Sequence, residues 1–391
     1  MTTSDDELRA LLDTLVELRR DLHKHPELGF EEHRTQRVVM TWLERLGYAP
    51  RACARTGVVA DLRPDHGGRC VALRADLDCL PMEETLDIPH RSIHAGRAHK
   101  CGHDGHTATL LGVATLLARR RDAIPGNVRL IFQPAEEGVD GGGAAVMIEE
   151  GVLEGVDEIY AYHNWPGFPR GALRVASGPA MASVHDVEID LHGKGGHASQ
   201  PQVTRDPVVG MAAMITALQT LVSRNLGALE PAVLSICRVR AGEANNVIPA
   251  SAHLEGTLRT FDDAVATRAV ARIREICEGV ARAHDLTAEV RLHGLYPALH
   301  NHAQCADAVR AAASDIAAFD SVSAEGLPLA AAEDFARFVQ HVPGAYFFLG
   351  AGDGPDSPGC HHPDFDFDDR LILPAMRLFV RLVEQRLVCN G

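Results

Sequence analysis

A cysteine and two histidines lie close together near residue 100. Cys101, His103 and His106 fall within six positions, and glycines at positions 102 and 105 let the backbone bend tightly between them. Thiolate and imidazole groups bind zinc, and imidazole also suits manganese, cobalt and nickel. The segment therefore predicts ligands for a transition-metal ion. The alternative is a glycine-rich turn before a helix, with incidental histidines.

Two adjacent carboxylates form a second candidate site. Glu136 and Glu137 follow the apolar run 128–132. Neighbouring side chains point in different directions, so one carboxylate can bind a metal while the other faces a substrate. Metal-assisted hydrolysis needs such a ligand and a separate proton carrier. Alone, a Glu-Glu pair is usually a solvated loop.

Histidines follow two further apolar segments. His163 comes directly after residues 158–162, and His361 and His362 lie near the end of the chain. A single histidine is more often a structural residue than a ligand. Four segments that each end in ligand-type residues argue for one shared site, because a sheet can gather the ends of its strands.

The elements that must position these residues alternate between strand-like and helix-like runs up to about residue 180. The predicted strands are residues 58–62, 70–75, 128–132 and 158–162, with a helix over 105–119. Such alternation predicts an α/β sheet with helices on both faces. Ligands of these sheets bind outside the carboxyl ends of the strands.

The pattern changes between about residues 184 and 292. Predicted elements follow the order strand, helix, strand, strand, helix, strand: residues 184–191, 207–221, 232–239, 250–258, 262–283 and 287–292. This order predicts a ferredoxin-like α+β insert. Afterwards the α/β pattern resumes, with a strand over 345–349 and a helix over 369–387. We predict a doubly wound mixed-sheet catalytic domain in two parts, 1–182 and 295–391, interrupted by the inserted domain 183–294.

Bulk properties narrow the classes of protein and partner. A chain of 391 residues is longer than one hydrophobic core usually supports, so two domains are expected. The net charge of −15 argues against a nucleic acid or an anionic membrane as partner, because both bind basic surfaces. The leucines over residues 8–22 predict an amphipathic helix and not a signal peptide, and no apolar run is long enough to span a bilayer. Nine scattered cysteines, an odd number, favour reduced thiols in the cytoplasm, most of them small buried apolar residues.

Together these motifs resemble the aminoacylase/carboxypeptidase family of co-catalytic metallohydrolases, in the amidohydrolase branch that includes hippurate hydrolases and auxin-conjugate hydrolases. The resemblance runs nearly end to end. Besides the segments above, it rests on residues 25–30 (HPELGF), 74–81 (RADLDCLP), 193–199 (GKGGHAS), 246–249 (NVIP) and 333–335 (EDF).

The resemblance implies two divalent metal ions per subunit, drawn from manganese, zinc, cobalt or nickel. The metal ligands matching the family pattern are Cys101, His103, Glu137, His163 and His361. The thiolate of Cys101 is expected to bridge the two ions, and Glu136 to act as general base. His362 matches less well than His361, since the family places its histidine two residues before the proline. Ala98 and Lys100 depart from the family pattern, which has Met and Ala there, and are expected to alter the pocket wall.

Residues of the insert are expected to complete the site. In the family, the residue matching His197 stabilises the oxyanion from the partner subunit, which implies a homodimer through this dimerisation (lid) domain. Asn246 and Arg259 are candidates to bind a substrate carboxylate. Asp78 and Asp104 are candidates to orient metal ligands.

The expected function is hydrolysis of the amide bond of N-acyl amino acids to a carboxylic acid and an amino acid. The alternative within the same scaffold is a dipeptidase or carboxypeptidase. A zinc nucleobase deaminase would need Cys-x-x-Cys, which the sequence lacks. A metal-binding protein without catalysis would lack the base or a ligand, yet Glu136 and Glu137 are both present.

Overall fold

The chain forms two compact units. The computed structural model describes residues 5–64, 66–354 and 356–387, so Cys389 lies outside the described part. Unit 1 comprises Met1–Ala180, His300–Leu327 and Asp334–Gly391, and unit 2 comprises Met181–Leu299 and Pro328–Glu333. The segments with the predicted metal ligands all belong to unit 1.

Unit 1 is built on an eight-stranded mixed sheet with the strand order β1-β2-β4-β3-β5-β16-β6-β15. Its strands are β1 (Arg51–Cys53), β2 (Gly57–Asp61), β3 (Cys70–Asp76), β4 (Asn127–Gln133), β5 (Glu158–Pro169), β6 (Ala172–Arg174), β15 (Ser321–Ser323) and β16 (Gly344–Gly352). The four adjacent strands β4, β3, β5 and β16 run parallel. Their carboxyl ends therefore lie at one edge of the sheet. Where the chain passes between the units, β7 (Gly178–Met181) pairs with β14 (Leu299–Asn301).

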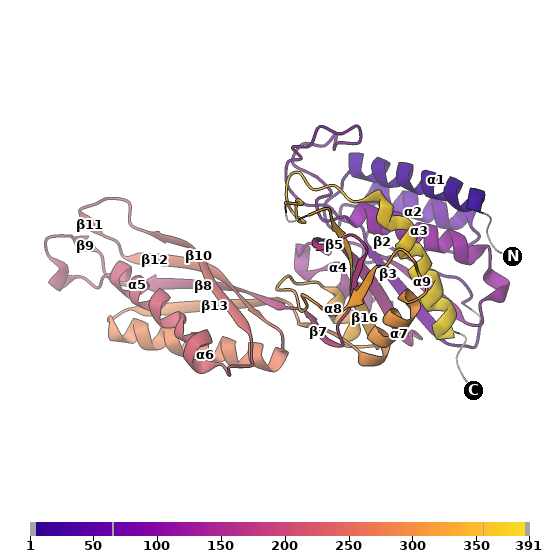
Figure 1. Ribbon diagram of the computed structural model, residues 1–391. Helices are drawn as coiled ribbons and strands as arrows, with labels where there is room; N and C mark the ends of the chain where they lie inside the picture. The colour runs from indigo at the N-terminus through magenta and orange to yellow at the C-terminus, as the bar shows by residue number, and fades with distance from the viewer. Residues whose placement is uncertain (1–4, 65, 355, 388–391) are drawn as a thin grey trace. The chain divides into compact units, whose positions relative to one another are not determined.

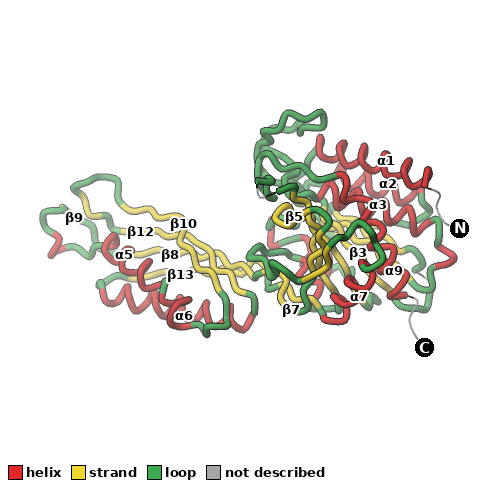
Figure 2. Tube along the Cα trace, in the orientation of Figure 1, coloured by secondary structure: helices red, strands yellow, loops and turns green. Residues whose placement is uncertain are grey.

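Helices cover this sheet (Figures 1 and 2). They are α1 (Asp5–Lys24), α2 (His33–Arg45), α3 (His103–Ala118), α4 (Gly143–Glu149), α7 (Ala303–Ala313), α8 (Phe335–Val339) and α9 (Ile372–Leu387). Helices α3 and α9 pack against β3 and against each other, and α1 packs on α3. Every residue of α3 from His103 to Leu117 is buried, which explains why it lacks a polar face.

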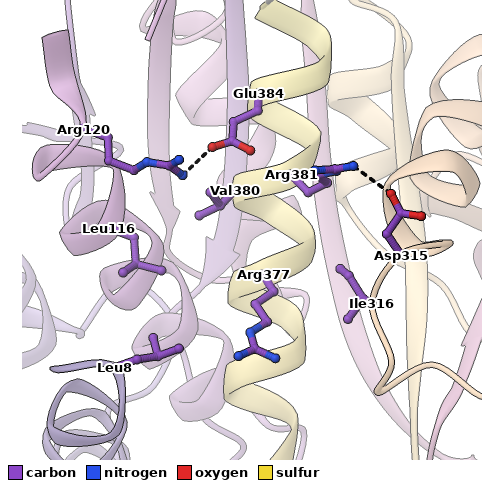
Figure 3. Close-up of a pocket in the computed structure, with 9 residues that line it drawn as sticks. All are labelled: Leu8, Leu116, Arg120, Asp315, Ile316, Arg377, Val380, Arg381 and Glu384. Carbon is purple, nitrogen blue, oxygen red and sulfur yellow. Dashed lines mark hydrogen bonds and ion pairs between the residues drawn. The ribbon is translucent and has the colours of Figure 1, made fainter. Parts of the chain in front are cut away.

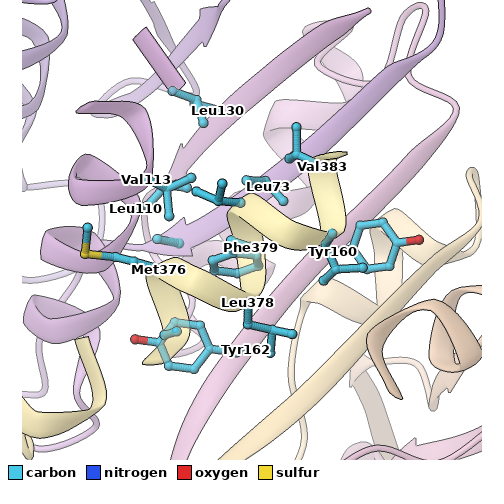
Figure 4. Packing of buried hydrophobic residues seen from close by; sticks show 14 of the residues in the cluster. Leu73, Leu110, Val113, Leu130, Tyr160, Tyr162, Met376, Leu378, Phe379 and Val383 are labelled. Atoms are coloured by element: carbon cyan, nitrogen blue, oxygen red, sulfur yellow. The ribbon is translucent and has the colours of Figure 1, made fainter. Parts of the chain in front are cut away.

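The core of unit 1 lies between the sheet and these helices (Figure 4). Leu73 of β3, Leu110 of α3 and Phe379 of α9 are all at most 1% exposed and point toward one another. The ring of Phe379 meets that of Tyr162 on β5 edge to face. Burial of this kind fixes the positions of β3, α3 and β5, which carry the candidate site.

Unit 2 is built on a four-stranded sheet with two helices on the same face of it (Figure 1). Its main elements are β8 (Ser183–His192), α5 (Pro207–Leu218), β10 (Ala232–Ala241), β12 (Ser251–Thr260), α6 (Asp263–Ala283) and β13 (Thr287–Tyr296). The four strands pair antiparallel in the order β10-β12-β8-β13. This is the predicted ferredoxin-like arrangement. A small sheet pairs β9 (Gly196–His197) with β11 (Val247–Ile248).

The predicted fold class is thus confirmed: a mixed α/β sheet in one unit and a separate antiparallel sheet in the other. Several predicted boundaries differ by a few residues. The helix expected over 207–221 ends at Leu218 and is followed by a π-helical turn, Leu221–Asn225. Strand β5 continues past residue 162 to Pro169. Among the described residues, no helix is long and apolar enough to cross a membrane.

Candidate metal centre

Sharp backbone turns at the strand ends present the candidate residues. Helix α3 begins at His103, directly after Gly102, whose φ of 107° favours glycine. A Cβ at Gly102 would also lie 2.1 Å from Oδ1 of Asn164. Only glycine therefore allows Cys101 and His103 to approach β5 this closely.

The structure brings together all five predicted ligand residues. The ligand atoms of Cys101, His103 and His163 lie within 4.8 Å of one another. Those of Cys101, Glu137 and His361 form a second such group. The two groups share one atom, the sulfur of Cys101, so a bridging position for this thiol fits the geometry.

Hydrogen bonds orient the two buried imidazoles. Nδ1 of His103 lies 2.9 Å from the carbonyl oxygen of Asp78, and Nδ1 of His163 lies 2.6 Å from that of Asn164. A carbonyl can only accept, so each Nδ1 carries a proton. In a neutral ring this leaves the lone pair on Nε2. Nε2 of His163 points to the sulfur of Cys101, 3.2 Å away.

The two adjacent glutamates are held by a strained turn. Ala135 has a φ of 52°, unusual for a residue with a side chain. Its N–H donates to Oε1 of buried Glu32 at 2.8 Å, and the N–H of Glu137 donates to Oδ2 of Asp78 at 3.0 Å. The turn aims both carboxylates at the cluster, since Glu136 and Glu137 form a third group with His103.

The electrostatic environment favours positive charge. Burial opposes protonation of His103, yet the neighbouring carboxylates of Asp76, Asp78 and Glu137 outweigh it and raise its pKa to about 10. Contact with the thiol of Cys360, burial and the charge of Glu137 raise the pKa of Cys101. A cation at the cluster would offset this negative charge and stabilise the thiolate.

Two buried atoms test whether a metal fits these residues. Nε2 of His103 and Oε1 of Glu137 have no hydrogen-bond partner among the described residues. Buried polar atoms are rarely left without partners, and ligand atoms are an exception when a metal satisfies them. The donor set of thiol, imidazole and carboxylate also suits zinc, manganese, cobalt or nickel. The residues present therefore fit divalent cations.

His106, Asp104 and Asp78, which the sequence had also singled out, are buried near the cluster. His106 bridges Asp76 and Asn164, with Nδ1–Oδ1 and Nε2–Oδ1 distances of 2.6 and 2.7 Å. The side chain of Asp104 contacts His23 at 2.9 Å and contacts no predicted metal ligand through a hydrogen bond in the described structure. Asp78 holds His103 and Glu137, the positioning role expected of it.

Two neighbours of Cys101 also differ from expectation. Lys100 was expected at the pocket wall, but its side chain is completely buried and its ammonium group contacts Glu84 and the carbonyl of Phe365. Cys360 was not among the predicted ligands, but its sulfur lies 3.7 Å from the carbonyl oxygen of Cys101. In the sequence, only its position directly before the predicted ligand His361 indicated that Cys360 lies near the cluster.

The remaining predicted site residues lie in unit 2. His197 is exposed, and its Nδ1 accepts from the N–H of Ser199 at 3.1 Å, so that Nε2 carries the proton in the neutral ring. Asn246 is its neighbour, since its carbonyl accepts from the N–H of Ala198 at 3.0 Å. Arg259 on β12 is half-buried and donates from Nη1 to the carbonyl of Ala330 at 2.8 Å.

A cavity of about 270 Å³ lies elsewhere in unit 1, along α9 (Figure 3). Leu116 and Val380 form part of its apolar lining, and ion pairs link Arg120 to Glu384 and Arg381 to Asp315 at its rim. None of the residues of the metal cluster lines it. We assign it no part in the chemistry of the cluster.

A sulfur, imidazoles and carboxylates at the strand ends of an α/β sheet define the site of a metallohydrolase. The sequence model of Peptidase family M20/M25/M40 matches residues 72–385. The chain belongs to this family. It is therefore a metal-dependent hydrolase that acts on amide or peptide bonds.

Relatives of described activity cover nearly the whole chain. N-acetyl-L-cysteine deacetylase of Bacillus subtilis is 40% identical over 94% of this chain and 87% of its own length. Thermostable carboxypeptidase 2 of Saccharolobus solfataricus is 38% identical over 92% of this chain and 91% of its own length. Hippurate hydrolase of Campylobacter jejuni is 33% identical over 96% of this chain and 97% of its own length.

Solved structures agree with this assignment. A protein of methicillin resistant Staphylococcus aureus has a TM-score of 0.90 at 31% identity and covers 98% of both chains. A Bacillus subtilis protein described as a dinuclear metal binding peptidase from the M20 family has a TM-score of 0.84 at 36% identity, covering 97% of this chain and 99% of its own.

Proposed function

We propose that this enzyme hydrolyses the amide bond of N-acyl amino acids, releasing a carboxylic acid and a free amino acid, with two divalent cations per subunit. One observation carries the proposal: the five predicted ligands fall into two groups that share the sulfur of Cys101. The Bacillus subtilis structure described as dinuclear supports the same number of metals. The cations we propose are manganese, zinc, cobalt or nickel.

Bound divalent cations would supply Lewis acidity and lower the pKa of a water molecule towards neutrality. The protein's own contribution is the proton path. Glu136 takes a proton from the attacking water as its oxygen adds to the amide carbonyl carbon. The same carboxyl then delivers that proton to the leaving amine nitrogen as the C–N bond breaks. Glu136 is only 6% exposed, so bulk water competes little for the proton.

We assign the remaining steps to unit 2. Because the N–H of Ser199 donates to Nδ1 of His197, the proton of the neutral ring is on Nε2. This Nε2–H would donate to the developing oxyanion. As in the family resemblance, it would act in the site of the partner subunit. Asn246 and Arg259 would bind the carboxylate of the amino-acid half. Arg259 uses one of its five N–H groups on Ala330, which leaves donors for a substrate.

The alternative substrate class is a dipeptide or a peptide C-terminus, which the carboxypeptidase relative supports. The deacetylase and hippurate hydrolase relatives favour N-acyl amino acids. A panel of hippurate, N-acetyl amino acids and dipeptides, each assayed with one defined metal, separates the two. We expect the N-acyl substrates to have the higher kcat/KM. Faster cleavage of dipeptides with a free amino terminus would overturn the assignment.

We also propose a homodimer formed through unit 2. Most of the large apolar side chains that are exposed among the described residues lie in this unit: Val203, Val208, Val209, Val222, Leu229, Val233, Val239 and Val247. Strand β10 lies at one edge of the sheet and offers backbone groups for pairing. Exposed apolar side chains and an open strand edge are typical of an interface between subunits.

A cytoplasmic location remains part of the proposal. All eight cysteines in the described part of the chain are free thiols. Reduced thiols fit the cytoplasm better than an oxidising compartment. Labelling of the thiols in cell extract under non-reducing conditions would test this.

A further inference from the structure

The ammonium group of Lys100, the residue that precedes Cys101, is completely buried. The side chain is 0% exposed, and Nζ donates to Oε1 of Glu84 at 2.6 Å and to the carbonyl oxygen of Phe365 at 2.7 Å. Burying an ammonium group costs several kcal/mol unless it is paired and hydrogen-bonded. Lys100 satisfies that condition by joining two segments that are far apart in the sequence.

The backbone of the same residue holds the ligand segment near the end of the chain. The carbonyl of Lys100 accepts from the N–H of His361 at 2.6 Å. Lys100 therefore contacts His361 through its backbone carbonyl and Phe365 through its ammonium group. It also directly precedes Cys101 in the chain. One residue thus ties the segment that carries the shared sulfur to the segment that carries His361.

The segment around His361 depends on such contacts. Residues 356–367 contain no helix or strand, and the imidazole of His361 is 53% exposed. Its φ of 67° is strained for a residue with a side chain. By contrast, His103 lies on α3 and His163 on β5, both packed in the core. Both groups include Cys101, which directly precedes α3, but only the group with His361 takes its other two ligands, Glu137 and His361, from segments without helix or strand.

The carboxylate of Glu84, which holds Lys100, has further hydrogen-bond partners. Oε1 of Glu84 also contacts Nε2 of His23 on α1 at 3.1 Å, and Oε2 accepts from the N–H of Ser92 at 2.8 Å. Burial would raise the pKa of Glu84, but the hydrogen bonds from His23 and Lys100 outweigh it and lower the pKa to about 2. The carboxylate that holds Lys100 thus stays ionised at neutral pH.

We propose that Lys100 is a positioning residue that holds His361 in place and thereby sets the affinity for one of the two cations, the one bound by Cys101, Glu137 and His361. The inference rests on the proposed two-cation function. The other group, with His103 and His163, does not depend on this contact. Groups that hold metal ligands typically contribute about 10–100-fold in metal affinity.

The test is a titration of metal-free protein with Mn²⁺, followed by calorimetry and by competition with a chelator. Lys100→Met fills the buried space but cannot donate to Phe365. We expect wild type to bind two ions, and the variant to bind one with unchanged affinity and the other about 10–100-fold more weakly. Two ions bound with wild-type affinities would overturn the proposal, whatever happens to stability.

A matched control breaks another ion pair of unit 1. Arg386 on α9 donates from Nε to Oε2 of Glu158 at 2.8 Å, and neither residue contacts the cluster. Arg386→Met should lower the Tm yet leave both metal affinities unchanged. Equal loss of metal in both variants would mean that general destabilisation, and not positioning, is responsible.

Two further arms keep the result interpretable. If Lys100→Met does not fold, Lys100→Gln retains a donor for Glu84 but is too short to reach Phe365 as well. It should show the same selective weakening, and unchanged affinities would overturn the proposal. The wild-type arm tests the proposed function separately, since a wild type that binds a single ion refutes the two-cation centre and this inference with it.

Discussion

Replacing Glu136 by glutamine separates proton transfer from metal binding. Glutamine preserves the volume of a side chain that is 6% exposed. Oε2 of Glu136 lies 3.9 Å from Nε2 of His103, and Glu136 belongs to neither of the two groups that share Cys101. The substitution should therefore leave both proposed cations bound while it removes the proton carrier.

The expected loss follows from the role assigned to the carboxylate. General acid–base catalysis by a positioned side chain contributes about 10²–10⁴-fold. At 1.36 kcal/mol per factor of ten, this corresponds to an increase of about 3–5 kcal/mol in the activation barrier. Because Glu136 acts on both the attacking water and the leaving amine, we expect a loss near the upper end, mainly in kcat.

The assay measures kcat and KM on hippurate and on an N-acetyl amino acid, with metal content determined on the same samples. Glu149→Gln is the matched control, since Glu149 lies exposed on α4 of the same unit and should not affect turnover. A loss of only a few-fold in kcat with two metals bound would refute Glu136 as the base. Loss of metal from Glu136→Gln would show that it is a ligand.

Three other predictions follow from the same structure. Cys101→Ala should lose bound metal as well as activity, because both ligand groups contain its sulfur; elemental analysis of an active, metal-loaded variant would contradict this. Burial opposes protonation of His23, but Asp104 and Glu84 outweigh it and raise the pKa of His23 to about 9. Since this folded-state pKa exceeds the unfolded value of about 6.5, protonated His23 stabilises the fold below about pH 6 by about 3 kcal/mol, a contribution lost as the pH rises through 9. Urea unfolding of wild type and His23→Gln should therefore converge at high pH, and a pH-independent difference would exclude a charged His23. Val239→Lys on the edge strand β10 should weaken the proposed dimer, as sedimentation would show; an unchanged dimer would place the interface elsewhere.

The sequence predicted the regular elements well where periodicity was strong. The strands over 70–75 and 128–132 correspond to β3 and β4, and the helix over 262–283 corresponds to α6, which Asp262 caps through the N–H groups of Ala264 and Val265. Strands of three residues, such as β1 and β15, carry no periodic signal and were not predicted. Helix α2 was missed although Thr35, Val39 and Leu43 recur every four positions on its buried face.

The end of β5 could not be predicted because proline normally ends a strand. The sequence predicted a strand over residues 158–162 only, and Pro166 lacks an N–H, which argues against a longer strand. In the structure the pairing with β16 shifts register between Gly350 and Gly352, and this irregularity accommodates the strand as far as Pro169. His163 consequently lies within a strand and not after one.

Residue types predicted which side chains lie together in the metal cluster, but not which neighbouring residues position them. The positive φ of Ala135 and of His361, and the contacts of Glu32 and Lys100 with these segments, arise from tertiary structure. No local pattern around Glu32 or Glu84 indicates that the carboxylate is buried. Positioning residues of this kind become visible only with coordinates.

The most direct test of the central claim is anomalous X-ray diffraction from crystals of the Mn²⁺- or Zn²⁺-loaded enzyme. The account predicts two metal peaks, one on each side of the sulfur of Cys101, with His103 and His163 near one and Glu137 and His361 near the other. A single peak, or two peaks that do not share Cys101 as a ligand, would contradict it.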